Sequence, residues 1–244
     1  NQNADIQGMN RYFGWYEKRV QDILPWVEGL EKKYPWQRLM LTEYGADANI
    51  AHQTEVLGDA LNWGASFYPE TFQTKIHEYQ WGVIAEHPYI IASYLWNMFD
   101  FAVPMWKRGG IPARNMKGLI IFDRKTKKDS YFWYKANWSK DPVVYLTQRR
   151  NVNRERKNTS VTVYSNVGVP EVYLNGQKLD GVRRGYTDVH YVFDNVTLAE
   201  GKNTLKAVVR ADGKEYTDEI EWFYRGERTR KADSSVNEHE HSGW

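Results

Sequence analysis

Three short segments of the sequence carry residue types that could act on a sugar. They are the aromatic run 10–16, the acidic run 43–47 and the run 96–100. Aromatic rings stack on the C–H faces of pyranoses, and a carboxylate can attack or stabilise an oxocarbenium-like carbon. A single glutamate after a strand is weak support, because most such carboxylates are solvated or paired with a base. Together, however, the three segments are typical of a sugar-binding site.

Each of the three segments follows an apolar stretch that we predict to be a β-strand. The predicted strands cover 4–9, 38–42 and 89–96, and helical spacing of apolar residues separates them over 20–30 and 70–86. The last stretch is continuously apolar, as in strands buried on both faces of a parallel sheet. Alternating strands and helices predict an α/β arrangement. Ligands bind at the carboxyl ends of such strands, which is where the three segments fall.

The pattern changes near residue 140. Short stretches of alternating polar and apolar residues follow over 159–165, 171–174, 190–193, 204–209 and 218–223. Asn175-Gly176 is a hairpin signal, because both residues tolerate the positive φ that a tight turn requires. Short strands at this spacing predict a β-sandwich of immunoglobulin-like type.

Composition excludes several classes of function. The 244 residues contain 33 basic and 31 acidic side chains, so a net charge of +2 gives no electrostatic reason to expect nucleic acid or a membrane surface as partner. No apolar run approaches the roughly 20 residues of a membrane helix. The absence of cysteine removes disulfides, thiolate nucleophiles and cysteine-ligated metals.

Five motifs in consistent order resemble glycoside hydrolase family 2, which contains retaining β-galactosidases and β-glucuronidases. The motifs lie at 10–16, 42–47, 96–101, 115–129 and 134–139, and the resemblance covers roughly residues 4–142. It implies an α/β plus all-β fold: strands six to eight of a (β/α)8 TIM barrel, followed by an immunoglobulin-like β-sandwich. The corresponding domains are 1–140 for the part of the barrel and 141–227 for the sandwich, with a polar tail over 228–244.

The resemblance also implies roles for individual residues. Glu43 matches the catalytic nucleophile, and Tyr12 matches the tyrosine that hydrogen-bonds this nucleophile. The Asn-x-Lys pattern at 115–117 matches the one that holds the substrate carboxylate in β-glucuronidases, although similar segments occur in β-galactosidase-like members. The implied substrate-binding residues are Asn10, Tyr16, Trp96, Asn115 and Lys117.

These roles predict a retaining exo-β-glycosidase that hydrolyses terminal β-galactosides of oligo- or polysaccharides. A β-glucuronidase that uses Asn115 and Lys117 for the uronate carboxylate is the alternative. A third hypothesis is a non-catalytic carbohydrate-binding or barrel-complementing fragment. The resemblance favours a periplasmic or secreted bacterial protein with no cofactor in this chain. A divalent metal ion in the parent enzyme would have its ligands mostly upstream.

A retaining enzyme needs a second carboxyl group, about 5–5.5 Å from the nucleophile, as acid/base. In the family this glutamate follows the fourth barrel strand, and no counterpart precedes Glu43 in the sequence. The upstream part of the enzyme is therefore an expected partner. We predict that residues 1–244 alone do not hydrolyse aryl β-galactosides, as a chromogenic assay would show. Ordinary turnover by this polypeptide would contradict the prediction.

Overall fold

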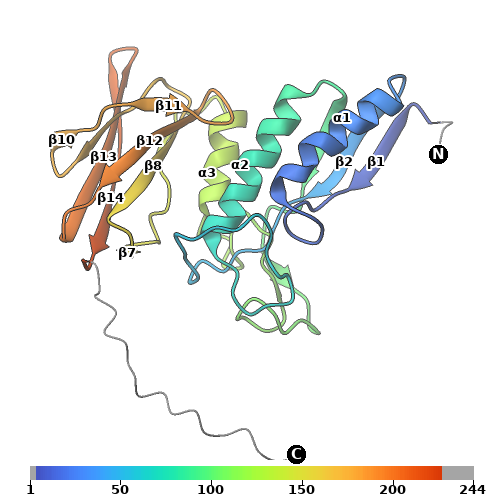
Figure 1. Ribbon diagram of the computed structural model, residues 1–244, viewed down its shortest axis with the longest axis horizontal. Helices are drawn as coiled ribbons and strands as arrows, with labels where there is room; N and C mark the ends of the chain where they lie inside the picture. The colour runs from blue at the N-terminus through green and yellow to red at the C-terminus, as the bar shows by residue number, and fades with distance from the viewer. Residues whose placement is uncertain (1–3, 227–244) are drawn as a thin grey trace, which may run out of the picture.

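The computed structural model describes residues 4–226, which form an α/β part and a β-sandwich lying side by side (Figure 1). Most regular structure in this range is β, with few helices. In the α/β part, three parallel strands lie in the order β1-β2-β3. The strands and helices of this part are β1 (Ile6–Asn10), a 3-10 turn (Val20–Asp22), α1 (Ile23–Lys33), β2 (Arg38–Tyr44), α2 (Glu70–Glu86), β3 (Ile90–Leu95), β4 (Phe101–Ala102), β5 (Arg114–Asn115) and α3 (Asp129–Trp138).

The predicted alternation of strands and helices is confirmed. Pro25 lies in the first turn of α1, where a proline costs no intrahelical hydrogen bond. β2 continues to Tyr44, so Glu43 belongs to the end of the strand rather than to the loop after it. Parallel strands need crossover connections, and α1 and α2 supply them.

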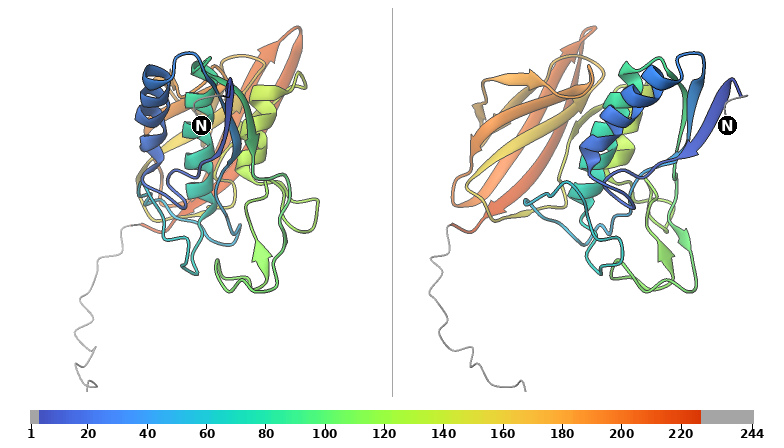
Figure 2. Two further views of the ribbon diagram at one scale, coloured as in Figure 1. Left: turned by 90° about the vertical axis from the view of Figure 1, so that its right-hand side faces the viewer. Right: turned by 45° about the vertical axis from the view of Figure 1, so that its right-hand side comes forward.

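The prediction that residues 89–96 are buried on both faces is wrong. Ile91 is 48% exposed and Tyr94 is 57% exposed. β3 is an edge strand of the sheet, and the helices lie only on the side that faces the sandwich (Figure 2). Side chains on the other side of the sheet therefore have no cover within residues 4–226.

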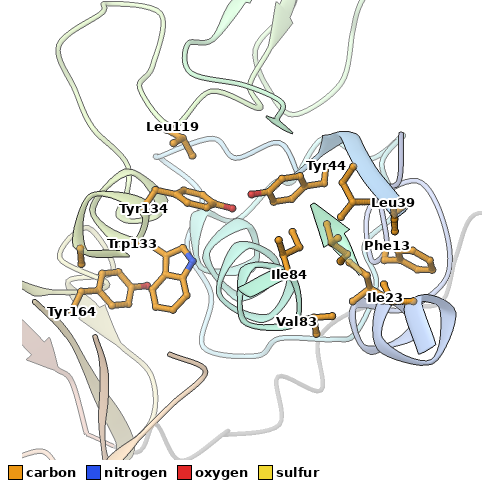
Figure 3. Close-up of a cluster of buried hydrophobic side chains, with 14 of the residues drawn as sticks. Phe13, Ile23, Leu39, Tyr44, Val83, Ile84, Leu119, Trp133, Tyr134 and Tyr164 are labelled. Carbon is orange, nitrogen blue, oxygen red and sulfur yellow. The ribbon is translucent and has the colours of Figure 1, made fainter. Parts of the chain in front are cut away.

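Helix α3 was not predicted from the sequence. Its residues Ser130, Trp133, Tyr134 and Ala136 are all buried, and they face more than one neighbour. A helix buried on several sides has no single apolar stripe, so the 3.6-residue period that reveals a helix is missing. The ring of Trp133 packs against Tyr164 of the sandwich, with centroids 5.1 Å apart (Figure 3).

The sandwich contains two sheets with the strand orders β10-β9-β13-β14-β7 and β11-β12-β8-β6. The alternating stretches predicted as strands all lie within strands, and the Asn175-Gly176 turn joins β9 to β10 with positive φ at both residues. The strands are β6 (Val144–Leu146), β7 (Asn153–Arg154), β8 (Asn158–Ser165), β9 (Glu171–Leu174), β10 (Gln177–Lys178), β11 (Val182–Arg184), β12 (His190–Thr197), β13 (Gly201–Ala211) and β14 (Lys214–Tyr224). The predicted polar tail 228–244 lies outside the described residues.

Buried polar contacts join the two parts. Arg154 of β7 forms an ion pair of 2.7 Å with Glu55, which lies in the long loop between β2 and α2, and both side chains are at most 5% exposed. Arg150 pairs with Glu70 at the start of α2. Because buried charges are costly without partners, these pairs restrict how the sandwich sits on the α/β part. Within residues 4–226, no helix has the length and apolar character needed to cross a membrane.

We predict that Arg154→Met destabilises the chain by about 3–5 kcal/mol, because it leaves Glu55 buried without a counterion. The control is Arg183→Met, which breaks the exposed pair with Asp194 and should cost about 0–1 kcal/mol. Urea unfolding of both variants measures the difference. An equal loss of unfolding free energy in both variants would show that burial of the Arg154–Glu55 pair does not add to its contribution.

Candidate active site

The three segments singled out in the sequence meet at one edge of the parallel sheet. Asn10, the last residue of β1, is in register with Glu43 of β2. The Trp96 amide, just after β3, donates a hydrogen bond of 2.8 Å to the Tyr44 carbonyl oxygen. Long loops extend from this edge, below the helices in Figure 1. The carboxyl ends of the strands thus gather the predicted residues, as parallel topology requires.

Glu43 and Tyr12 form the centre of the site. The Tyr12 hydroxyl donates a hydrogen bond of 2.5 Å to Glu43 Oε2. The Arg11 amide donates to the Glu43 carbonyl oxygen at 2.9 Å, which fixes the backbone beside it. Burial, and then the hydrogen bond to the Glu43 carboxylate, raise the pKa of Tyr12 well above its ordinary value. Tyr12 therefore stays protonated and remains a donor to Glu43.

Lys117 lies beside this pair with its charge already partnered. Its ammonium group forms an ion pair with Asp47, and both side chains are at most 1% exposed. Lys117 Nζ also donates to the Tyr16 hydroxyl at 2.8 Å, and the rings of Tyr16 and Tyr12 lie edge to face with centroids 5.0 Å apart. A continuous set of contacts therefore connects Lys117 to Glu43.

Asp47 lies in the acidic run 43–47 but was given no role of its own, and Arg108 was not identified from the sequence. Asp47 follows Glu43 by four residues, and this proximity was the available signal. Arg108 donates to the Tyr16 hydroxyl at 3.1 Å, and its guanidinium lies 3.4 Å from the centroid of the Trp106 ring. No carboxylate within residues 4–226 forms an ion pair with Arg108. Nothing in its local sequence distinguishes Arg108 from other basic loop residues.

The remaining predicted residues differ in how far they are buried. Asn10 is exposed, and its Oδ1 accepts a hydrogen bond of 2.6 Å from Thr42. Asn115 is buried, and its Oδ1 accepts the Lys117 amide at 3.0 Å. Trp96 is 37% exposed, and its ring lies edge to face with Phe101, with centroids 6.1 Å apart. Within the described residues, no group of three or more histidine, cysteine or acidic side chains could hold a metal ion.

Known proteins similar to this chain are glycoside hydrolases. A beta-glucuronidase from Bacteroides fragilis is 35% identical over 222 residues, covering 90% of the chain and 31% of that protein. The crystal structure of a putative beta-galactosidase from Bacteroides fragilis is 80% identical, covers 95% of the chain and 34% of its own, and has a TM-score of 0.90. The chain thus spans about a third of the length of these relatives.

Two further matches agree with these. An FMN-binding beta-glucuronidase from Faecalibacterium prausnitzii is 35% identical over 90% of the chain and 32% of its own, with a TM-score of 0.78. Residues 156–217, within the sandwich, match a family described as a domain of unknown function, DUF4982. The resemblance to the C-terminal portion of glycoside hydrolase family 2 enzymes is confirmed.

We predict that Glu43→Gln lowers the pKa of Tyr12, because the substitution removes the anionic acceptor and its charge. The pKa should stay above the ordinary value, since burial remains. NMR of tyrosine labelled with ¹³C at Cζ measures the titration. The control is Glu17→Gln, because Glu17 pairs with Arg11 and accepts the Tyr12 backbone amide but does not bond the Tyr12 hydroxyl. An unchanged Tyr12 titration in Glu43→Gln would contradict the hydrogen bond.

Proposed function

We propose that this chain, similar over nine-tenths of its length to the C-terminal portion of glycoside hydrolase family 2 enzymes, carries the nucleophile half of a retaining exo-β-glycosidase. The observation that carries the proposal is the hydrogen bond of 2.5 Å between the Tyr12 hydroxyl and Glu43 Oε2, at the carboxyl edge of a parallel sheet. Among the residues at this edge that the structure describes, Glu43 is the one carboxylate that accepts a hydrogen bond from a tyrosine hydroxyl.

In this mechanism the Glu43 carboxylate attacks the anomeric carbon, and the bond to the leaving group breaks. A second carboxyl group gives its proton to the leaving oxygen. Water then hydrolyses the glycosyl–Glu43 ester, with the second group acting as base. Asp47 is committed to Lys117 and to the Met116 amide, so we assign the acid/base to a residue outside this chain. Tyr12 holds the orientation of the Glu43 carboxylate throughout.

We further propose that β1, β2 and β3 are strands six to eight of a (β/α)8 barrel and that the sandwich is of immunoglobulin-like type. In support, the strands are parallel and joined by helices on one side. β1 and β3 each pair with one strand only within the described residues. A groove of about 510 Å³ beside β3, lined by Leu95, Met98 and Trp138 among others, offers apolar surface for further elements.

For the substrate, we infer β-glucuronides, with terminal β-galactosides as the second candidate. The Tyr16 hydroxyl accepts hydrogen bonds from both Lys117 and Arg108. Asp47 neutralises only one of these two cations. The surplus positive charge suits a sugar carboxylate, and two relatives at 35% identity are named beta-glucuronidases. The relative at 80% identity is named a putative beta-galactosidase, which favours the neutral sugar.

The nucleophile is tested in the full-length enzyme. A 2-fluoro-sugar inactivator should label Glu43, and Glu43→Gln should reduce kcat by about four to six orders of magnitude, as removal of a nucleophile does elsewhere. Glu17→Gln is the control, because Glu17 lies in the same site without reaching Glu43. Mass spectrometry of the labelled peptide locates the label, and labelling of any other residue refutes the assignment.

The substrate is tested by competing an aryl β-glucuronide with an aryl β-galactoside. We expect Arg108→Gln to reduce kcat/KM for the glucuronide by roughly 10- to 100-fold, the range for a lost hydrogen bond to a charged group. The galactoside should be affected less than threefold, as should both substrates in the neighbouring control Lys107→Gln. Wild-type preference for the galactoside would support the second candidate instead.

A further inference from the structure

Lys128 is a buried cation that the proposed mechanism does not use. It precedes α3, and its side chain is 0% exposed. Lys128 Nζ lies 3.1 Å from Asp100 Oδ1 and donates a hydrogen bond of 2.7 Å to the Met116 carbonyl oxygen. Burial lowers the pKa of Lys128 and raises that of Asp100, and each charge opposes the shift of the other. Because a buried ion pair adds little net stability, its location suggests another role.

Asp100 connects the loop that begins at Trp96 to the segment 115–118. Its Oδ1 accepts the Gly118 amide at 2.9 Å. A Cβ at Gly118 would lie 2.2 Å from the Asp100 nitrogen and 2.6 Å from Oδ1, so the two backbones are as close as glycine allows. The Lys128 amide adds a bond of 2.8 Å to the Leu119 carbonyl oxygen. These contacts fix the downstream end of the segment.

Met116 is held from both sides. Its amide donates to Asp47 Oδ1 at 2.7 Å. Its carbonyl oxygen accepts the Lys128 ammonium at 2.7 Å and the Ala48 amide at 2.9 Å. Met116 lies between Asn115 and Lys117, the two residues of the Asn-x-Lys pattern. The position of its backbone therefore sets where the Lys117 side chain reaches Asp47 and Tyr16.

We infer that Lys128 and Asp100 are positioning residues for sugar binding. They hold segment 115–118 so that Lys117 lies against Tyr16, and they touch neither Glu43 nor the reacting atoms. The inference rests on the proposed function of the site. It predicts that loss of the pair weakens the affinity for the sugar and leaves the reactivity of the nucleophile largely intact.

The test uses the full-length enzyme with two double variants. Lys128→Met alone would leave the Asp100 charge buried and threaten folding, so it is combined with Asp100→Asn. This double variant removes both charges, keeps an acceptor for the Gly118 amide and loses the bond to Met116. The matched control is Arg149→Met with Asp218→Asn, an ion pair of 2.6 Å within the sandwich. Thermal unfolding of both variants checks that they fold.

We expect KM of the Lys128/Asp100 variant to rise about tenfold for the glycoside that the wild type cleaves, while kcat stays within about threefold. The control should change neither constant, even if its melting temperature falls. A merely structural pair would give an unchanged KM, and that result would overturn the inference. A fall in kcat at unchanged KM would overturn it as well.

Hydrogen exchange separates this inference from the proposed function. Amide exchange of the peptide containing Met116 and Gly118, read by mass spectrometry, should be at least about tenfold faster in the Lys128/Asp100 variant than in wild type or control. Unchanged exchange would refute the positioning role whatever the activity. An inactive wild-type enzyme with the expected exchange pattern would instead refute the proposed function alone.

Discussion

The site depends on the buried ion pair between Asp47 and Lys117. Asp47 follows β2, and Lys117 lies on a segment 70 residues further along the chain. Neither side chain could be buried alone, because an isolated charge in the interior loses its hydration without compensation. Their pairing forces the two loops together, brings Tyr16 onto Lys117 and completes the contacts that lead through Tyr12 to Glu43.

The two cations beside Tyr16 differ in whether a carboxylate neutralises them. Lys117 is neutralised within the chain, whereas Arg108 has no acidic partner in residues 4–226. The Arg108 guanidinium packs on the Trp106 ring and remains free to pair with an anionic ligand. Lys117, the cation of the Asn-x-Lys pattern, is therefore neutralised by Asp47. Arg108, the cation without a carboxylate partner within residues 4–226, lies in a loop that no sequence motif marks.

The sandwich is joined to the α/β part by a shared apolar core and by ion pairs. Trp133 and Tyr134 of α3 share one apolar core with Tyr145 and Tyr164 of the sandwich. Arg150 pairs with Glu70 at the start of α2, and Arg154 pairs with Glu55 within the loop between β2 and α2. These ion pairs add geometric specificity to an apolar interface, because Arg150 bonds both carboxylate oxygens of Glu70.

Elements with a strong hydrophobic period were predictable from the amino-acid pattern, and the family resemblance singled out Glu43 and Tyr12. Alternating polar and apolar residues predicted the sandwich strands, and helical spacing predicted α2 over the same residues that the structure shows. Glu43 and Tyr12 were assigned through a family resemblance, and the structure places them in contact. Helix α3 and the pairing of the buried charges became visible only in the folded chain. Helix α3 has no apolar stripe, and the partners of Lys128, Asp47 and Arg108 are distant in sequence. Local patterns report which residues prefer burial, but the pairing of buried charges depends on which loops the fold brings together.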